Sequence, residues 1–221
     1  MRAFGKVVIA VVSLFPLLGV AQDAPKTMTK IVVQADGPDL PQDSFARKPK
    51  TIYRAGNSYC RIEEMPDPEH GIHGLTIISE PDIWMVNLAT KTAQHLVDGG
   101  PTYNCRLPIF LGPVAGTADN VNYVQLRLEF GHELEFFKKT GAIRQDPGPV
   151  LQNQRTVGYV IDMGSTRLAL YTYGPNDFPL LVGRTYDKKG ELIWYSGYGQ
   201  VPFDPKIFAK PDGVSIVEAK H

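Results

Sequence analysis

The sequence predicts a mainly β protein whose antiparallel sheet curls on itself, with one short helix. Short apolar or alternating runs follow one another between residues 51 and 97, separated only by turn residues. This spacing favours an antiparallel meander over βαβ units. The same rhythm returns between residues 156 and 198. About ten strands with one helix are too many for a flat sheet covered by that helix, so we expect the sheet to curl.

The N-terminus has the pattern of a secretory signal peptide, which we place at 1–21. Arg2 and Lys6 give a basic start, an apolar run follows from Val7 to Val20, and Ala21 is a small residue at the exit. A retained membrane helix is the alternative, but the run is short for a bilayer and contains Pro16. The pattern predicts export across the inner membrane.

Residues 22–221 are then expected to form a single domain, since one all-β domain often reaches roughly 200–250 residues. No cysteine directly follows the apolar run, so we expect a periplasmic protein without a lipid anchor. Without Arg2 and Lys6, 21 basic and 23 acidic side chains remain, a formal charge of −2. This balance gives no electrostatic basis for binding nucleic acid or an anionic membrane surface.

The first half of the chain contains six expected strands after a frayed arm. A proline-containing loop at 36–50 follows the first of them, and turn residues separate the others. The expected strands are 30–34, 52–54, 58–62, 75–78, 83–88 and 92–97.

The strand at 83–88 is apolar on both faces. Side chains alternate along a strand, so Ile83 and Met85 face one way while Trp84, Val86 and Leu88 face the other. A strand with one solvated face needs only one apolar side. We therefore expect both sides of this strand to be covered or to line a cavity.

The middle of the chain changes pattern twice. Three prolines interrupt the segment 101–113, which predicts an edge or crossing strand. The segment 124–130 alternates strictly between apolar and polar residues, which predicts a strand with one solvent-exposed face. The segment 131–140 then has an apolar helical stripe and ends at Gly141, so it predicts a short helix.

The second half predicts four strands, at 156–161, 167–173, 178–186 and 192–198. Alternation in the second and the last of these sets Leu170 opposite Tyr171, and Trp194 together with Tyr198 opposite Tyr195. These strands are rich in large apolar side chains on both faces. An apolar pocket inside a curled sheet accounts for this pattern, and ordinary core packing is the alternative.

Cys60 and Cys105 are the two cysteines of the chain. Both follow the signal, in a compartment where disulfides persist, so we predict a bridge between them. It would close a loop of about 46 residues and stabilise the fold by roughly 4 kcal/mol in the chain-entropy model. Two buried free thiols are the alternative, because free cysteine often packs in a core.

The sequence lacks the local motifs of common catalytic and phosphate-binding sites, so we predict that the protein is not an enzyme. His70 and His73, beside Glu69, are the best candidates for a metal site or for acid–base chemistry. The neighbouring glycines and prolines favour a solvated loop, and His95 and His132 would have to fold back to complete a site. We therefore predict no metal site and no cofactor.

The second half then resembles a known family. The segments LLVGRTYDKKGELIWYSGYGQ and VPFDPKIFAKPDGVSIVEAK are similar to the end of the lipoprotein localisation factor superfamily, the LolA-like outer-membrane lipoprotein-sorting proteins. Phe208, a short gap and the turn Pro211–Val214 stand where members often have the same pattern before a last short strand. GNSYCRIEE and SEPDIWMVNLATK resemble the family's early strands, so the resemblance spans about 50–217.

The resemblance implies an incomplete antiparallel β-barrel whose concave apolar side accepts an acyl chain, a lipid or a lipidated protein. Members have sizeable helices as a lid, whereas this chain offers one short helix and a proline-rich loop. A periplasmic binding or carrier protein is the function it implies, and the alternative is an envelope protein-interaction or sensor domain of the same fold. The expected groove residues on the strands at 83–88, 167–173 and 192–198 are Trp84, Tyr171 and Trp194, which are large, together with Val86 and Leu170. Alternation alone does not say which face of each strand lines the groove.

Overall fold

The computed structural model describes residues 25–38, 40–99, 105, 128–186 and 189–217. Thirteen strands of this part form one sheet. In chain order they are β1 (Thr27–Asp36), β2 (Lys50–Ala55), β3 (Tyr59–Glu64), β4 (Gly74–Ser79), β5 (Asp82–Asn87), β6 (Thr92–Val97), β7 (Ile143–Gln145), β8 (Val150–Leu151), β9 (Gln154–Met163), β10 (Thr166–Tyr173), β11 (Phe178–Tyr186), β12 (Lys189–Pro202) and β13 (Ser215–Ile216). The helical segments are the 3-10 turns η1 (Phe45–Arg47) and η4 (Pro205–Phe208) and the helix α1 (Glu133–Lys139).

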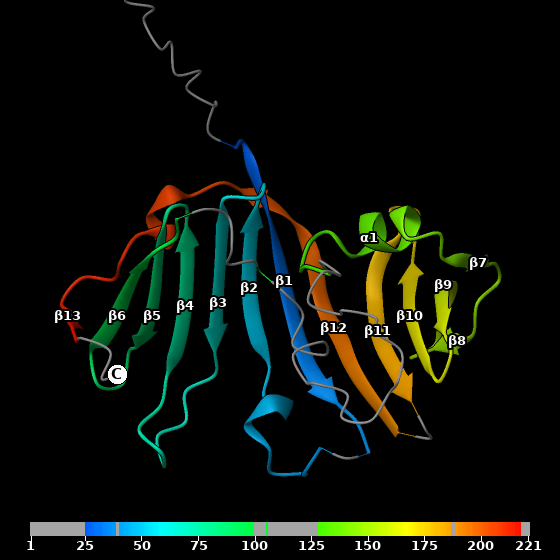
Figure 1. The fold of residues 1–221 in the computed structure, drawn as a ribbon, viewed down its shortest axis with the longest axis horizontal. Helices are drawn as coiled ribbons and strands as arrows, with labels where there is room; N and C mark the ends of the chain where they lie inside the picture. Colours follow the sequence, from blue (N-terminus) through cyan, green and yellow to red (C-terminus); the bar gives the residue numbers. More distant parts are fainter. Residues whose placement is uncertain (1–24, 39, 100–104, 106–127, 187–188, 218–221) are drawn as a thin grey trace, which may run out of the picture.

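The strands lie in the order β13-β6-β5-β4-β3-β2-β1-β12-β11-β10-β9-β7, and β8 also pairs with β9. Neighbouring strands are antiparallel except for β6 and β13, which are parallel. The two outermost strands do not pair with each other, so the curled sheet stays open (Figure 1). The predicted mainly β fold, a curled antiparallel sheet forming an incomplete β-barrel with one short helix, is therefore confirmed.

The ten strands expected between residues 30 and 97 and between 156 and 198 are present, and several are longer than the pattern indicated, most of all β1, β9 and β12. The short strands β7 and β8 carry no alternation and were not expected. The turn Pro211–Val214 precedes the last short strand, β13, as the resemblance implied. Residues 1–21 and 124–127 lie outside the described residues, as does nearly all of 101–113.

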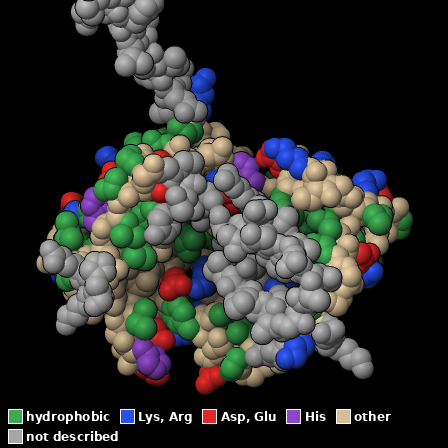
Figure 2. Space-filling model, in the orientation of Figure 1, with side chains coloured by type: hydrophobic (Ala, Val, Ile, Leu, Met, Phe, Trp, Pro, Cys, Tyr) green, Lys and Arg blue, Asp and Glu red, His purple; other side chains and the backbone are tan. Residues whose placement is uncertain are grey.

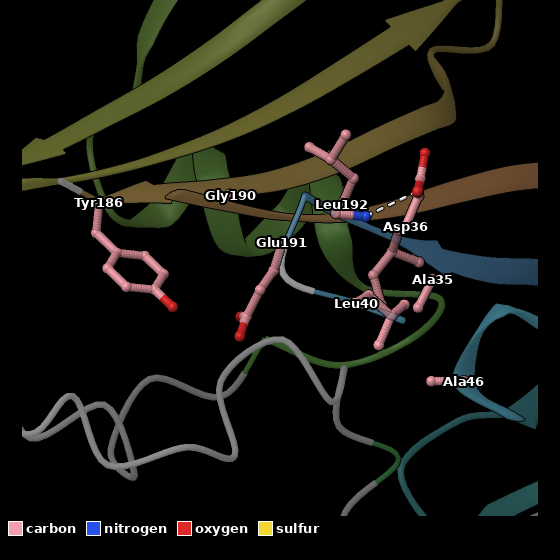
Figure 3. Close-up of a pocket in the computed structure, with 10 residues that line it drawn as sticks. Ala35, Asp36, Leu40, Ala46, Tyr186, Gly190, Glu191 and Leu192 are labelled. Atoms are coloured by element: carbon pink, nitrogen blue, oxygen red, sulfur yellow. Dashed lines mark hydrogen bonds between the residues drawn. The ribbon is translucent and has the colours of Figure 1, made fainter. Parts of the chain in front are cut away.

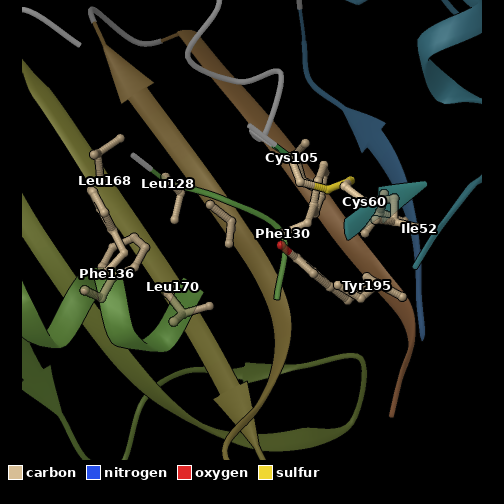
Figure 4. Packing of buried hydrophobic residues seen from close by; sticks show 14 of the residues in the cluster. Ile52, Cys60, Cys105, Leu128, Phe130, Phe136, Leu168, Leu170 and Tyr195 are labelled. Atoms are coloured by element: carbon tan, nitrogen blue, oxygen red, sulfur yellow. A yellow bond between two sulfur atoms is a disulfide. The ribbon is translucent and has the colours of Figure 1, made fainter. Parts of the chain in front are cut away.

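One face of the sheet, here called the inner face, carries the larger core cluster. Strands from both halves contribute to it, and α1 packs against it together with Phe130 and Leu128 (Figure 4). Its fully buried members include Phe137, at 0% exposure, from the helix. Burying each such side chain contributes about 1.5–3 kcal/mol. The cluster therefore fixes the helix over the strands β9 to β12.

The opposite face, here called the outer face, carries a second core cluster over β1 to β6. The C-terminal segment covers it, because Phe208 of η4 and Val214 pack among its strand residues. The strand residues are Met28, Ala55, Leu75, Ile77, Val86 and Ala93.

Both apolar faces of β5 are now explained. Ile83 belongs to the inner cluster and Val86 to the outer one, against which Trp84 also packs. The strand therefore separates two cores. Met85, on the inner face, is 41% exposed.

The predicted disulfide between Cys60 and Cys105 is confirmed. The two Cα atoms are 5.9 Å apart, and both residues are buried in the inner cluster. The backbone carbonyl of Cys105 accepts a hydrogen bond from the N–H of Phe130 at 2.8 Å. The bridge therefore ties β3 to the segment that leads into α1.

One predicted side-chain direction is wrong. Strict alternation put Tyr198 on the face opposite Tyr195, but both pack against the inner cluster, with ring centroids 6.2 Å apart. The register between β1 and β12 shifts at this point: Val32 pairs with Gly197, whereas the next residue, Val33, pairs with Tyr195. The extra residue, Ser196, forms a β-bulge, which reverses the alternation beyond it.

Candidate functional site

The inner face near α1 is the part of the molecule where polar and apolar groups converge. Glu133 and Glu135 lie in the first turn of α1, and Lys138 and Lys139 in the last. These charges complement the helix dipole. Gly141 follows with φ +74°, the left-handed conformation that ends many helices.

Two buried carboxylates anchor this segment to the sheet. Glu133 Oε1 accepts a hydrogen bond from the Tyr195 hydroxyl at 2.8 Å, and the Gly131 N–H donates to both carboxylate oxygens at 3.0 Å. Glu129 pairs with Nη2 of Arg54 at 2.5 Å. A Cβ at position 131 would lie 3.2 Å from Cγ of Arg54, and its φ is +86°, so glycine is required there.

Burial sets the electrostatics of these groups. It raises the pKa of Glu133, an effect that the hydrogen bonds from Gly131 and Tyr195 oppose. Burial also raises the pKa of Tyr198 far above its ordinary value, and the neighbouring Glu133 adds to the effect. Desolvation lowers the pKa of Arg54, while Glu129 counteracts it. The cluster is a buried polar network beneath the helix.

An open hollow of about 560 Å³, here called the upper hollow, lies between α1 and the end of the sheet next to it. Leu134, Phe178, Pro179 and Tyr198 give it apolar walls. The rings of Phe178 and Tyr198 pack with centroids 5.5 Å apart. The remaining lining residues form a mostly polar and charged rim: Gly131, His132, Glu135, Lys138, Lys139, Asn176 and Asp177.

A second hollow, here called the side hollow, lies over β3 to β6 and measures about 360 Å³. Ile62, Thr76, Met85 and Gln94 contribute to its lining. Figure 2 looks onto the inner face and shows hydrophobic side chains there between acidic and basic ones. This half of the inner face is therefore less fully covered by described residues than the half beneath α1.

The third, here called the lower hollow, measures about 230 Å³ and lies at the opposite end of β11 and β12 from the upper hollow. Leu40 and Ala46 of the loop around η1 face Tyr186 and Glu191 across it (Figure 3). The packed inner cluster separates the upper and lower hollows, since Val182 and Ile193 belong to that cluster and are buried.

The five groove residues expected from the sequence are not brought together. Leu170 is fully buried in the inner cluster, while Val86 is buried in the outer one. Trp84 stacks on His95 with ring centroids 3.9 Å apart. Tyr171 and Trp194 alternate with inner-face residues along β10 and β12, which places them on the outer face. Contact of these residues with a ligand stays a prediction.

The histidine loop splits between two carboxylates. His70 Nδ1 lies 3.1 Å from Asp67, whereas His73 Nε2 lies 3.5 Å from Glu63. The hydrogen bond with His70 is the main cause that lowers the pKa of Asp67. Across the described part of the chain, His, Cys, Asp and Glu side chains form no group of three placed to hold a metal ion.

Sequence reasoning missed Glu133, Phe178 and Arg54 as residues that shape the upper hollow and the network beneath it. Their partners are far away in the chain, as the pairing of Glu133 with Tyr195 illustrates. The only local signal was a carboxylate inside an apolar helical stripe.

In the part of the chain that the structure describes, no helix is both long and apolar enough to span a membrane.

No protein-family model matches the chain, and no match was found among curated proteins. Solved structures do resemble it. An uncharacterized conserved protein from Thermus thermophilus is similar over 87% of this chain and 90% of its own, with a TM-score of 0.50 and 10% identity, which shows a common fold.

Two further structures are similar at lower scores. One is the LolA superfamily protein NE2245 from Nitrosomonas europaea, with a TM-score of 0.34 and 12% identity over 86% of this chain and 92% of that one. The other is an outer membrane lipoprotein-sorting protein domain from Vibrio parahaemolyticus, with a TM-score of 0.31 and 10% identity over 83% and 87%.

Proposed function

We propose that this chain is an exported binding or carrier protein that holds an acyl chain of a lipid or lipidated protein in the upper hollow. The observation that carries the proposal is an open hollow with apolar walls and a charged rim, next to a helix on the inner face of an open sheet. Its volume of about 560 Å³ falls within the roughly 300–1,000 Å³ of small-molecule sites.

The lining suits an amphiphile. Leu134, Phe178 and Tyr198 offer apolar and aromatic surface to a hydrocarbon chain, while Lys138 and Lys139 stand at the rim for a polar head. A chain that buries about 300 Å² of apolar surface gains roughly 7 kcal/mol before ordering costs. That gain is sufficient for reversible binding, which a carrier requires.

Two features of the chain support a role in the cell envelope. The basic start, the apolar run and Ala21 make a signal-peptide pattern at 1–21. The disulfide between Cys60 and Cys105 fits a compartment where such bonds persist. We therefore propose that the mature chain is periplasmic.

An envelope protein-interaction domain is the second candidate, and the two sheet edges favour it. Val150 in β8 and Ile143 in β7 are 67% and 64% exposed at one edge. Val97 and Ile216 are 67% and 59% exposed at the other. Exposed strands with apolar side chains are surfaces to which a partner strand can add.

Titration of the delipidated protein with a solvatochromic fatty-acid probe tests the proposal. We expect the probe to brighten and a phospholipid to displace it. Leu134→Glu should weaken binding by at least tenfold, because the carboxylate keeps its water or ionises poorly beside the chain. Val32→Glu, on the half-buried outer face of β1, is the matched control and should bind like the unchanged protein. A folded protein that binds no probe would favour the protein-interaction candidate.

A further inference from the structure

The lower hollow has a wall held by an arginine of the η1 loop. Arg47 pairs with Asp36, and its Nη2 donates to the carbonyls of Leu40 at 2.7 Å and of Gly37 at 2.9 Å. Asp36 is therefore neutralised by its own partner. The loop places Leu40 and its neighbour Ala46 along one side of the hollow as fixed apolar surface.

The other side of the hollow leads to a buried cation. Arg184 is 3% exposed, and its Nη2 lies 3.1 Å from Oε2 of Glu191. Its guanidinium carbon lies 4.7 Å from the ring centroid of Tyr186. Both Glu191 and Tyr186 line the lower hollow, and Figure 3 shows the two side chains pointing to the same side of the sheet. Arg184 thus contacts two of the residues that line the hollow.

The guanidinium of Arg184 is only partly satisfied. Its Nε and Nη1 are buried and have no hydrogen-bond partner among the residues that the structure describes. A buried donor without a partner destabilises the fold, and more so when it is charged. Guanidinium groups present a planar fork of N–H groups that matches a carboxylate. The unpaired nitrogens therefore point to an additional anionic partner.

We propose that the lower hollow is a second binding site, separate from the upper one, for a medium-chain fatty acid and its carboxylate. The carboxylate binds Arg184, and the hydrocarbon chain lies against Leu40 and Ala46. The hollow of about 230 Å³ is smaller than a typical site of roughly 300 Å³ or more, which limits the length of the chain. Glu191, whose side chain is 45% exposed, turns toward solvent as the ligand enters.

Isothermal titration of the mature chain with sodium octanoate, 1-octanol and sodium acetate tests this proposal. Octanoate should bind at least tenfold more tightly than octanol, which lacks the charge, and than acetate, which lacks the chain. Charge-assisted hydrogen bonds of about 1.5–3 kcal/mol correspond to about tenfold or more. Equal binding of octanoate and octanol would overturn the assignment of Arg184.

Two variants separate the site from a general effect on folding. Arg184→Gln should reduce octanoate affinity to that of octanol and leave octanol binding unchanged. Glu191→Gln should strengthen octanoate binding severalfold, because it removes a competing carboxylate. Unchanged octanoate binding in Arg184→Gln would overturn the proposal.

If Arg184→Gln does not fold, Ala46→Trp in the η1 loop decides the question. The larger side chain fills the lower hollow, so it should abolish octanoate binding while the long-chain probe still binds the upper hollow. Octanoate binding that survives this change would contradict the proposal. If the unchanged protein binds octanoate but does not bind the long-chain probe, that result would contradict the carrier function of the upper hollow. It would leave the proposal for the lower hollow intact.

Discussion

The Tyr195 hydroxyl donates a hydrogen bond to Glu133 Oε1 at 2.8 Å, which joins β12 to α1 inside the molecule. Both residues are buried, at 4% and 1% exposure. A buried carboxyl loses its water, so it depends on donors from the protein. This bond, together with the N–H of Gly131, holds the helix beside the upper hollow.

Tyr195→Phe should destabilise the protein by about 1–3 kcal/mol, because Glu133 loses a donor where water does not replace it. Urea unfolding followed by circular dichroism measures the effect. Tyr53→Phe is the matched control, because Tyr53 lies half-buried on the outer face, where Lys30 approaches its ring. We expect the control to cost less than about 0.5 kcal/mol. Equal losses for the two variants would contradict a special role for the bond.

The pKa of Glu133 predicts how stability depends on pH. Burial raises this pKa, so the folded state holds the proton more tightly than the unfolded state. The stabilisation is complete below the ordinary glutamate pKa of about 4.3 and is lost as pH rises through the folded value. Glu133→Gln cannot ionise, so the stability of the unchanged protein relative to this variant should fall as the pH rises above about 4.3. Denaturant unfolding of both proteins at several pH values measures this difference in stability. A difference that stays flat or rises with pH would contradict the assignment.

Arg54→Met should cost about 3–5 kcal/mol, because it leaves Glu129 as a buried carboxylate without its partner. Arg167→Met provides the comparison, since its pair with Asp162 is exposed and should cost less than about 1 kcal/mol. Denaturant unfolding of the two variants measures both values. A similar small loss in both would show that the buried pair does not hold the segment that leads into α1.

The double variant Cys60→Ala and Cys105→Ala should lose roughly 4 kcal/mol, mainly through the greater freedom of the unfolded chain. The two residues are 1% and 0% exposed, so a thiol reagent should reduce the bridge only when the protein opens. Mass analysis after timed reduction, with and without urea, checks this expectation. Rapid reduction without urea would contradict a buried bridge.

Local patterns predicted strands well because alternation is a property of neighbours. They predicted that both faces of β5 are covered or line a cavity, and that Leu170 and Tyr171 lie on opposite faces. They did not predict which face holds which core, because Val86 is buried only when Phe208, far along the chain, covers it. The bulge at Ser196 left no local signal either, so Tyr198 was placed on the wrong face.

The candidate site was less predictable than the fold. Each hollow joins segments that are distant in the sequence: α1 with the turn before β11 in one, and the η1 loop with β12 in another. Size and apolar character singled out Trp84 and Trp194, but large side chains also build cores. The partners of Arg184 and Glu133 depend on the curl of the sheet, which alternation alone does not specify.

Paramagnetic broadening by a stearic acid with a nitroxide near the end of its chain tests the central claim most directly. In a ¹⁵N-labelled, delipidated sample, the label should broaden the amides of Leu134 and Phe178 most strongly, because the acyl chain occupies the upper hollow. The amides of Trp84 and Val86, beside the outer cluster, should keep their intensity. Strongest broadening at Trp84 and Val86, or no broadening in a folded sample, would contradict acyl-chain binding on the inner face.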